Sequence, residues 1–205
     1  GLPTWYTTQC NQCSAGCGII AKNREGRVIN VEGNPEHPTS RGKICSIGQA
    51  GLQEAYSPDR YEGPTQGGNE LEWNVAAQVA ADSVKAANAS GKAVAWLGRY
   101  RSGASGAVVS QFASAVGGNV LLWESLNRND LAAACESVFG TSALPTYHLA
   151  DAHTIVSFGA EFLSTWGDNV GQALGYGHSK DPDRDGFVSR LVCIEPRVGS
   201  TSCNA

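Results

Sequence analysis

The chain has 205 residues, of which 41% are hydrophobic and 17% charged, and its formal net charge is −4. This length and hydrophobic content suffice for a buried core, which excludes global disorder. No stretch approaches the ~18 consecutive apolar residues of a membrane-spanning helix, and an acidic chain without a basic block is not expected to bind nucleic acid.

Four of the seven cysteines lie within the first 45 residues, in the arrangement C-x2-C-x3-C-x27-C: Cys10, Cys13, Cys17 and Cys45. A tight turn can direct the first two sulfurs inward, the third can reach another metal atom, and the distant fourth closes the cage. Four thiolates suit a [4Fe–4S] cluster or a tetrahedral zinc ion. Zinc ribbons usually have two separate C-x2-C knuckles, so we predict a [4Fe–4S] cluster. The odd number of cysteines argues against a pure disulfide framework.

The residues around these cysteines predict a small domain that holds the cluster. Residues 19–22 and 27–31 predict a β-hairpin, and turn residues at 33–38 return the chain toward the first three cysteines. A short helix is expected over residues 46–56, which places Cys45 at a helix N-terminus, where thiolate charge is stabilised. We expect the iron–sulfur domain to span residues 1–63.

Alternating helices and strands are predicted after a glycine-rich linker at residues 63–69. The expected helices cover residues 70–89, 105–116 and 130–139, and the expected strands cover residues 92–97, 119–123, 153–158 and 191–195. Such alternation predicts a parallel sheet covered on both faces, with ligands bound beyond the carboxyl ends of the strands. The predicted fold class is therefore α/β, with the cluster domain followed by an incomplete Rossmann-like domain over residues 64–205.

As a set, the N-terminal motifs resemble the iron–sulfur domain of the molybdopterin oxidoreductase superfamily. The matching pieces are CNQCSAGCGI at residues 10–19, EGRVINVEGNPEHPTSRGKIC at 25–45 and GQAGLQEAYSPDRYEGP at 48–64. Later stretches, at residues 149–170 and 191–205, resemble the polysulfide-reductase branch. They are also similar to the large iron–sulfur (B) subunit of alternative complex III, a membrane assembly that oxidises quinol.

The resemblance implies an electron-transfer subunit rather than a catalytic one, with a [4Fe–4S] cluster on the four cysteines. The implied partners are a further iron–sulfur protein, a multihaem cytochrome c and quinol-binding membrane subunits of a respiratory or photosynthetic complex. Because the chain contains no methionine, we expect a processed, truncated piece of a longer exported subunit. Its expected location is the periplasmic face of a bacterial membrane, with the cytoplasmic face as the alternative.

Two departures from the family pattern put a bound molybdopterin in doubt. Family enzymes commonly carry a basic residue two positions after the fourth cysteine, where this chain has Ile47, and an aliphatic side chain cannot donate hydrogen bonds. Lys43, on the other side of Cys45, is not an obvious substitute. Cys135 is the only thiol where a molybdenum ligand would be sought, and its alanine-rich helical surroundings predict a buried structural cysteine.

Two other functions stay open from the sequence. One is the N-terminal part of a catalytic subunit with molybdenum and two pterins, of the polysulfide or thiosulfate reductase or formate dehydrogenase type. The other is a zinc-stabilised binding module without redox activity. Cys193 is expected in the core, and Cys203 has no assigned role. Residues 181–186 begin like a calcium loop but lack its final glutamate, so a solvated turn is expected there.

Overall fold

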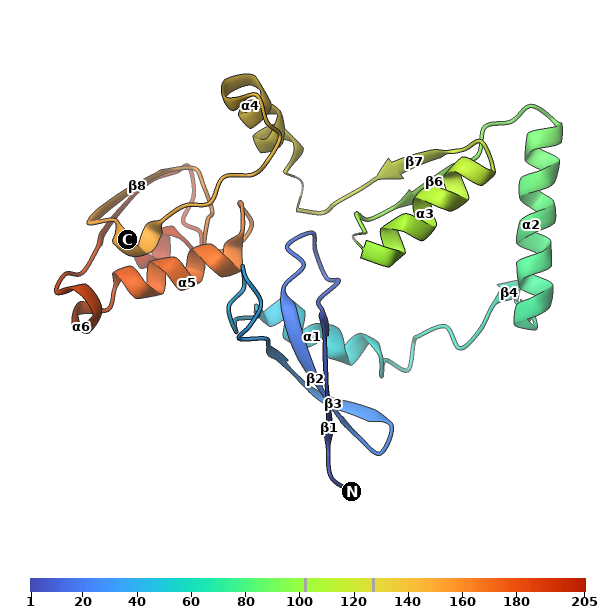
Figure 1. Cartoon of the computed structure of the whole chain (residues 1–205), viewed down its shortest axis with the longest axis horizontal. Helices are drawn as coiled ribbons and strands as arrows, with labels where there is room; N and C mark the ends of the chain where they lie inside the picture. The colour runs from blue at the N-terminus through green and yellow to red at the C-terminus, as the bar shows by residue number, and fades with distance from the viewer. Residues whose placement is uncertain (102, 127) are drawn as a thin grey trace. The chain divides into compact units, whose positions relative to one another are not determined.

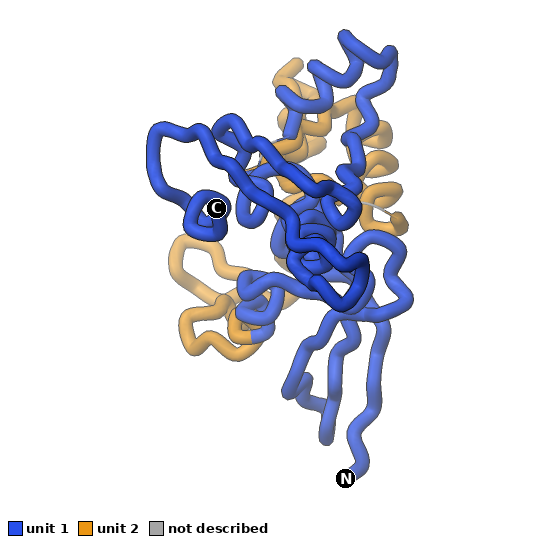
Figure 2. Tube along the Cα trace, turned by 90° about the vertical axis from the view of Figure 1, so that its left-hand side faces the viewer, with its two compact units in different colours: residues 1–52, 126–205 blue, residues 53–125 orange. Residues whose placement is uncertain are grey.

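The computed structural model describes residues 1–101, 103–126 and 128–205. The chain forms two compact units, one of residues 1–52 with 126–205 and the other of residues 53–125 (Figure 2). The boundary expected between residues 63 and 64 falls inside the second unit. The separation into an iron–sulfur domain over residues 1–63 and an α/β domain over residues 64–205 stays a prediction.

The first unit begins with a three-stranded antiparallel sheet of β1 (Thr4–Gln9), β2 (Gly18–Arg24) and β3 (Arg27–Gly33), drawn in blue in Figure 1. The predicted hairpin is confirmed, and its turn has positive φ angles at Glu25 (53°) and Gly26 (79°), as two-residue hairpin turns commonly require. Strand β1 pairs with β2 up to Gln9, opposite Gly18. This pairing sets the two ends of the intervening cysteine loop side by side.

A helix follows the return of the chain toward this sheet. Helix α1 (Ser46–Glu54) confirms the prediction over residues 46–56. In the second unit, the glycine-rich segment forms a small hairpin of β4 (Thr65–Gln66) and β5 (Asn69–Glu70) rather than an open linker. The two glycines between these strands both have positive φ angles, which suits a tight hairpin turn.

The rest of the second unit is a β–α–β arrangement preceded by a long helix. Its elements are α2 (Trp73–Ala89), β6 (Ala95–Gly98), α3 (Gly103–Ala115) and β7 (Asn119–Leu122). Strands β6 and β7 are parallel, and α3 is the crossover between them. The expected helix and strand order of this part is confirmed.

The first unit resumes with a second parallel pair. Its elements are α4 (Asn129–Phe139), the short 3-10 helix η1 (Leu149–Asp151), β8 (Thr154–Phe158), α5 (Asn169–Ser179), α6 (Pro182–Asp185), β9 (Arg190–Ile194) and the 3-10 helix η2 (Ser202–Asn204). Strands β8 and β9 are parallel neighbours. The α/β class with parallel strands is thus confirmed. Each unit thus contains its own pair of parallel strands.

Two buried cores stabilise the first unit. One lies under the N-terminal sheet and contains Cys10 and Cys17 together with Val170 of α5. The other joins Phe162, Tyr176 and Leu191 beneath the β8–β9 pair. Of the helices that the structure describes, none has both the length and the apolar composition needed to cross a membrane.

Candidate metal centre

The first three cysteines lie in the loop between β1 and β2. The backbone N–H of Cys10 donates to the carbonyl oxygen of Cys17 over 2.8 Å, and this bond closes the loop. Within it, the N–H of Gly16 donates to the carbonyl oxygen of Cys13 over 3.4 Å. Gly16 has a φ of 58°, and a Cβ at this position would overlap the side-chain amide of Gln9. Glycine is therefore required where the loop folds back on itself.

The segment between β3 and α1 brings Cys45 to this loop through a close approach of two backbones. A Cβ on Gly33 would overlap the carbonyl group of Gly42 and would lie 2.7 Å from the backbone nitrogen of Lys43. The N–H of Gly42 also donates to the carbonyl oxygen of Asn34 over 2.8 Å. Gly33 thus sets the position of the chain just before Cys45.

His37 holds the same return loop against the sheet. Its ring lies on Gly18, where a Cβ would come within 2.6 Å of ring atoms. The Nδ1 atom of His37 accepts a hydrogen bond from the backbone N–H of Ser40 over 3.2 Å, and Ser40 is 1% exposed. His37 is therefore a turn residue near the cysteines, as the sequence predicts.

Helix α1 begins immediately after Cys45 and packs on the three-cysteine loop. Gly48 is buried, and a Cβ there would lie 3.4 Å from Sγ of Cys10 and 2.7 Å from Cγ1 of Ile44. One turn later, Gly51 lies against the side chain of Gln12. These two glycines let the helix approach the thiols closely. The N-terminus of α1, with its partial positive charge, lies next to Cys45.

The four thiols act on one another electrostatically. Burial raises the pKa of Cys10, and Cys13 and Cys45 raise it further, against the lowering effect of a hydrogen bond from the backbone of Gln12. Burial also raises the pKa of Cys17 to about 12, with added contributions from Cys10, Asp168, Cys13 and Cys45. Iron bound at this site would favour the thiolate forms of Cys10 and Cys17, because its positive charge would compensate for their burial.

Three of the four cysteines share one core, in which Cys10 and Cys17 are buried and against which Cys45 packs. All seven cysteines are free thiols, so the quartet is available for ligation. Across residues 1–101, 103–126 and 128–205, no three His, Cys, Asp or Glu side chains are grouped around a point that would hold one metal ion.

The residues flanking Cys45 have different surroundings. Ile47, in the first turn of α1, is 58% exposed. Lys43 and Cys45 both line a cavity of about 460 Å³ that also includes Leu163 and Val170. The fold therefore places a lysine, not Ile47, beside a cavity at Cys45.

Helix α5 contributes residues that the sequence did not identify. Val170 is 6% exposed and belongs to the same buried cluster as Cys10 and Cys17. Asp168, the N-cap residue of α5, accepts a hydrogen bond from the N–H of Gly171 over 3.2 Å. An aspartate before a helix is a recognisable N-cap signal, but nothing local connects it to cysteines so far away along the chain.

The remaining cysteines lie elsewhere in the fold. Cys135 is 4% exposed within α4, which confirms the expected buried cysteine. Cys193, in β9, packs against the second core and is partly buried. Burial raises its pKa, and Glu195 and Glu161 raise it further. Cys203 is exposed.

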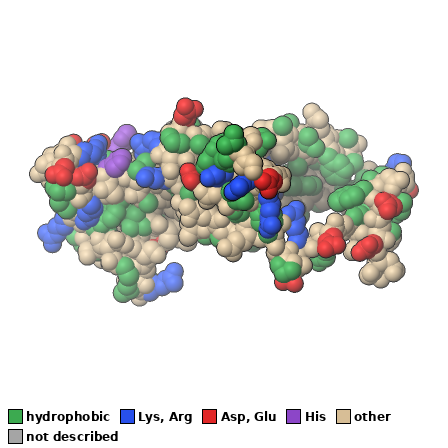
Figure 3. All heavy atoms as spheres, turned by 90° about the horizontal axis from the view of Figure 1, so that it is seen from below, with side chains coloured by type: hydrophobic (Ala, Val, Ile, Leu, Met, Phe, Trp, Pro, Cys, Tyr) green, Lys and Arg blue, Asp and Glu red, His purple; other side chains and the backbone are tan. Residues whose placement is uncertain are grey.

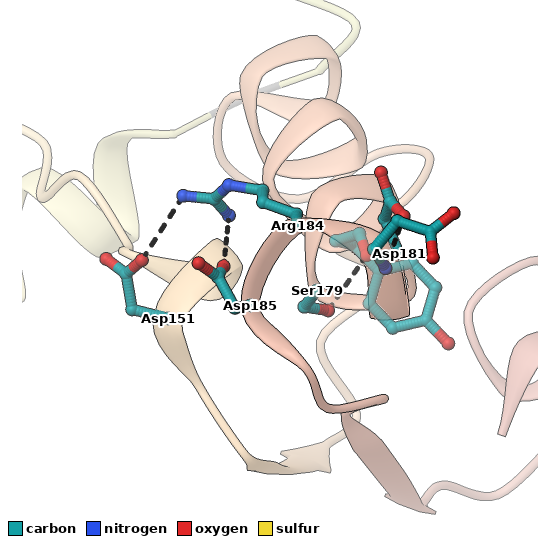
Figure 4. Close-up of polar contacts among 7 residues, drawn as sticks. Asp151, Ser179, Asp181, Arg184 and Asp185 are labelled. Atoms are coloured by element: carbon teal, nitrogen blue, oxygen red, sulfur yellow. Dashed lines mark hydrogen bonds and ion pairs between the residues drawn. The ribbon is translucent and has the colours of Figure 1, made fainter.

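The acidic segment at residues 181–186 does not converge on one point. Asp181 caps α6 by accepting from the N–H of Asp183 over 3.1 Å. Figure 4 shows Arg184 lying between Asp185 and Asp151, with nitrogen–oxygen distances of 3.3 Å and 3.6 Å. These carboxylates make separate contacts, and the exposed segment forms the short helix α6 where the sequence predicts a turn.

Comparison with known families identifies the N-terminal region. Residues 3–57 match the molybdopterin oxidoreductase Fe4S4 domain. This match covers the three-stranded sheet, the cysteine loop and α1, and the cofactor of such a domain is a [4Fe–4S] cluster. It agrees with the resemblance carried by the sequence motifs.

The chain is also similar to oxidoreductase subunits over its full length. It is 27% identical to the menaquinone reductase molybdopterin-binding-like subunit of Nitratidesulfovibrio vulgaris, of which it covers 30%. It is 22% identical to the arsenate respiratory reductase molybdopterin-containing subunit ArrA of a Shewanella species, of which it covers 25%. A stretch of 38% of the chain is 37% identical to the F420-dependent formate dehydrogenase subunit alpha of Methanocaldococcus jannaschii, across 12% of that protein. The chain thus spans less than a third of these relatives, and together they support the molybdopterin oxidoreductase superfamily.

Proposed function

We propose that this chain is the cluster-bearing part of an electron-transfer subunit, in which Cys10, Cys13, Cys17 and Cys45 hold one [4Fe–4S] cluster. The observation that carries the proposal is the packing of Cys10, Cys17 and Cys45 in one core, within a region that matches a known Fe4S4 domain. When bound, such a cluster accepts and releases one electron at a time. The protein residues hold the cluster, exclude water from Cys10 and Cys17, and place the N-terminus of α1 beside Cys45.

We further propose that the chain works without molybdenum. Ile47 offers no hydrogen bond or charge at the position where family enzymes commonly carry a basic residue. Cys135 is buried within α4, which is unsuited to a ligand that must face a cofactor. Both residues support a role in electron transfer rather than in substrate conversion.

The edge formed by the carboxyl ends of β8 and β9 adds to this support. Ligands of parallel α/β sheets commonly bind at such an edge, where phosphate groups need N–H and O–H donors. Here the Oε2 atom of Glu161 accepts from the N–H of Thr201 over 3.2 Å, from its hydroxyl over 3.1 Å and from the hydroxyl of Ser164 over 3.1 Å. The other oxygen of Glu161 lies so close to Gly199 that a Cβ there would overlap it.

Glu161 is ionised, and its carboxylate lies at the strand edge where the phosphate of a ligand would otherwise bind. Burial acts to raise the pKa of Glu161, but the hydrogen bonds from Thr201 and Ser164 and the charge of Arg197 outweigh it, so the pKa is lowered. Glu161 is therefore a carboxylate at neutral pH and takes up donors that a phosphate would use. These residues do not fit the phosphates of a pterin dinucleotide, and no step of the proposed function depends on one.

The wider assembly is proposed from the relatives and from the surface. One relative is named as a menaquinone reductase subunit, which supports a place in a complex that exchanges electrons with quinones. On the sequence resemblance, we propose a quinol-oxidising membrane complex of the alternative complex III kind. Large hydrophobic side chains are exposed on several elements, including Trp73 (73%), Phe139 (73%) and Phe158 (72%), and Figure 3 shows hydrophobic side chains reaching the surface. Exposed apolar area of this kind is typical of surfaces that other chains cover.

The proposed neighbours are a further iron–sulfur protein, a multihaem cytochrome c and quinol-binding membrane subunits. The proposed location is the periplasmic face of the membrane. A second candidate is the front part of a catalytic subunit with molybdenum and pterin, and the matches to ArrA and to a formate dehydrogenase subunit favour it.

Metal analysis of the intact native complex separates these candidates. We expect much more iron than molybdenum in the complex, with molybdenum near the detection limit. The reason is that neither Ile47 nor the β8–β9 edge is suited to the molybdenum cofactor. Molybdenum in stoichiometric amount would overturn the molybdenum-free assignment and favour the catalytic subunit. Zinc in place of iron would overturn the electron-transfer function itself.

A further inference from the structure

The start of helix α5 places a fixed carboxylate at the edge of the cysteine core. Val170, the second residue of α5, is 6% exposed and packs in the same buried cluster as Cys10 and Cys17. Asp168 lies two positions before Val170 and is tied down by the hydrogen bond from the N–H of Gly171. A Cβ on Gly171 would overlap Oδ2 of Asp168, so the glycine makes room for the carboxylate. The position of this charge is therefore set by the helix.

The charge of Asp168 is not cancelled by a direct ion pair. In the described part of the chain, no Lys or Arg lies within ion-pair distance of it. Arg41 and Arg184 line the same cavity of about 390 Å³ as Asp168, but the guanidinium of Arg184 is paired with Asp151 and Asp185 and no ion pair joins Arg41 to Asp168. Because Val170 packs with Cys10 and Cys17, the N-terminus of α5 keeps this carboxylate two residues from the cysteine core.

A fixed negative charge near an iron–sulfur cluster disfavours the reduced form, because reduction adds one electron to a group that is already anionic with its thiolates. We propose that Asp168 is a positioning residue that sets the reduction potential of the cluster and holds it below the value that the cysteine loop alone would give. The inference rests on the proposed function, since it requires the cluster to be present. It assigns to α5 a redox role in addition to its packing role.

The test is a potentiometric titration of the full subunit in its native complex, followed by electron paramagnetic resonance. The signal of this cluster is identified as the one that disappears in the Cys13→Ser variant. Asp168→Asn removes the charge, while asparagine caps helices about as well as aspartate. We expect the ratio of reduced to oxidised cluster at a fixed potential to rise by about tenfold, which is ~59 mV for a one-electron couple.

Matched variants separate charge from structure. Asp181→Asn changes a second helix cap, that of α6, which accepts a comparable hydrogen bond over 3.1 Å, and it should leave the potential unchanged. Asp168→Glu restores the charge and should return the potential toward that of the unmodified protein. If Asp168→Asn loads poorly, Asp168→Ser keeps a capping oxygen without the charge and should show the same positive shift.

The possible outcomes separate a failure of this inference from a failure of the proposed function. An unchanged potential in a fully loaded Asp168→Asn or Asp168→Ser variant would overturn the role of Asp168 alone, because the cluster would still be present. An equal shift in Asp181→Asn would also overturn it, since the effect would then follow helix capping rather than charge near Cys17. An unmodified protein without any iron–sulfur signal would overturn the proposed function, and this inference with it.

Discussion

Replacing Cys13 by serine is expected to abolish the [4Fe–4S] cluster and to loosen the region before residue 53. Cys13 lies in the loop that the Cys10–Cys17 backbone bond closes, and its thiol acts on both Cys10 and Cys17. Without the cluster, this small region loses its main cross-link, because metal ligation in such domains contributes directly to folding. Anaerobic purification followed by iron analysis and absorption spectroscopy would measure the loss.

A matched control is available in the same chain. Cys203 is an exposed free thiol, so Cys203→Ser should keep the iron content and the spectrum of the unmodified protein. If Cys13→Ser retained a complete four-iron cluster, Cys13 would not be a ligand. The assignment of the quartet would then have to be revised.

Replacing Gly33 by alanine is expected to destabilise the same region without touching a ligand. The added Cβ would overlap the backbone carbonyl of Gly42, which cannot move aside as a flexible side chain would. Such overpacking costs about 1–3 kcal/mol of the free energy of unfolding. It should also displace the return loop that carries Cys45 and so reduce the yield of cluster. Chemical denaturation followed by circular dichroism, together with iron analysis, would measure both effects.

The control for this variant is Gly63→Ala. Gly63 has open space around it and an ordinary φ angle, so its free energy of unfolding should change by no more than about 0.5 kcal/mol. Equal stability of the Gly33 and Gly63 variants would contradict the close backbone approach between Gly33 and Gly42. A stable Gly33→Ala protein with a full cluster would show that the position of Cys45 does not depend on this close approach.

The parts of the fold that depend on local signals could be predicted from the sequence. The hairpin turn at Glu25 and Gly26, helix α1 after Cys45, and the end of α4 at Gly140, which is left-handed with a φ of 70°, all follow from turn and capping chemistry. The cysteine spacing could be interpreted as a cluster motif because ligands close in sequence must also be close in space.

Two elements could not be predicted, for opposite reasons. Strand β1 is exposed along its whole length, so its sequence has no buried face to reveal its period. Helix α5 contains three glycines, which individually disfavour a helix. It forms because its packing compensates, with Gly175 against Leu149 and Tyr176 in the second core. Tertiary contacts of this kind override local propensity.

The site shows the same division between local and distant contributions. The quartet of cysteines could be predicted from their spacing, and the turn role of His37 could be predicted from its neighbours. The contributions of Val170 and Asp168 were not, because they depend on how α5 packs against a loop far away along the chain. The pairing of β8 with β9 likewise depends on contacts between distant segments, which the order of elements does not specify.

The central claim is that four thiols share one four-iron cluster, and the most direct measurement is the content of iron, zinc and acid-labile sulfide per chain in the anaerobically purified full subunit. Loss on mutation of each quartet cysteine in turn assigns the metal to this site. We predict four irons and four sulfides lost together from every such variant. One zinc per chain with no sulfide, lost in the same variants, would contradict the account.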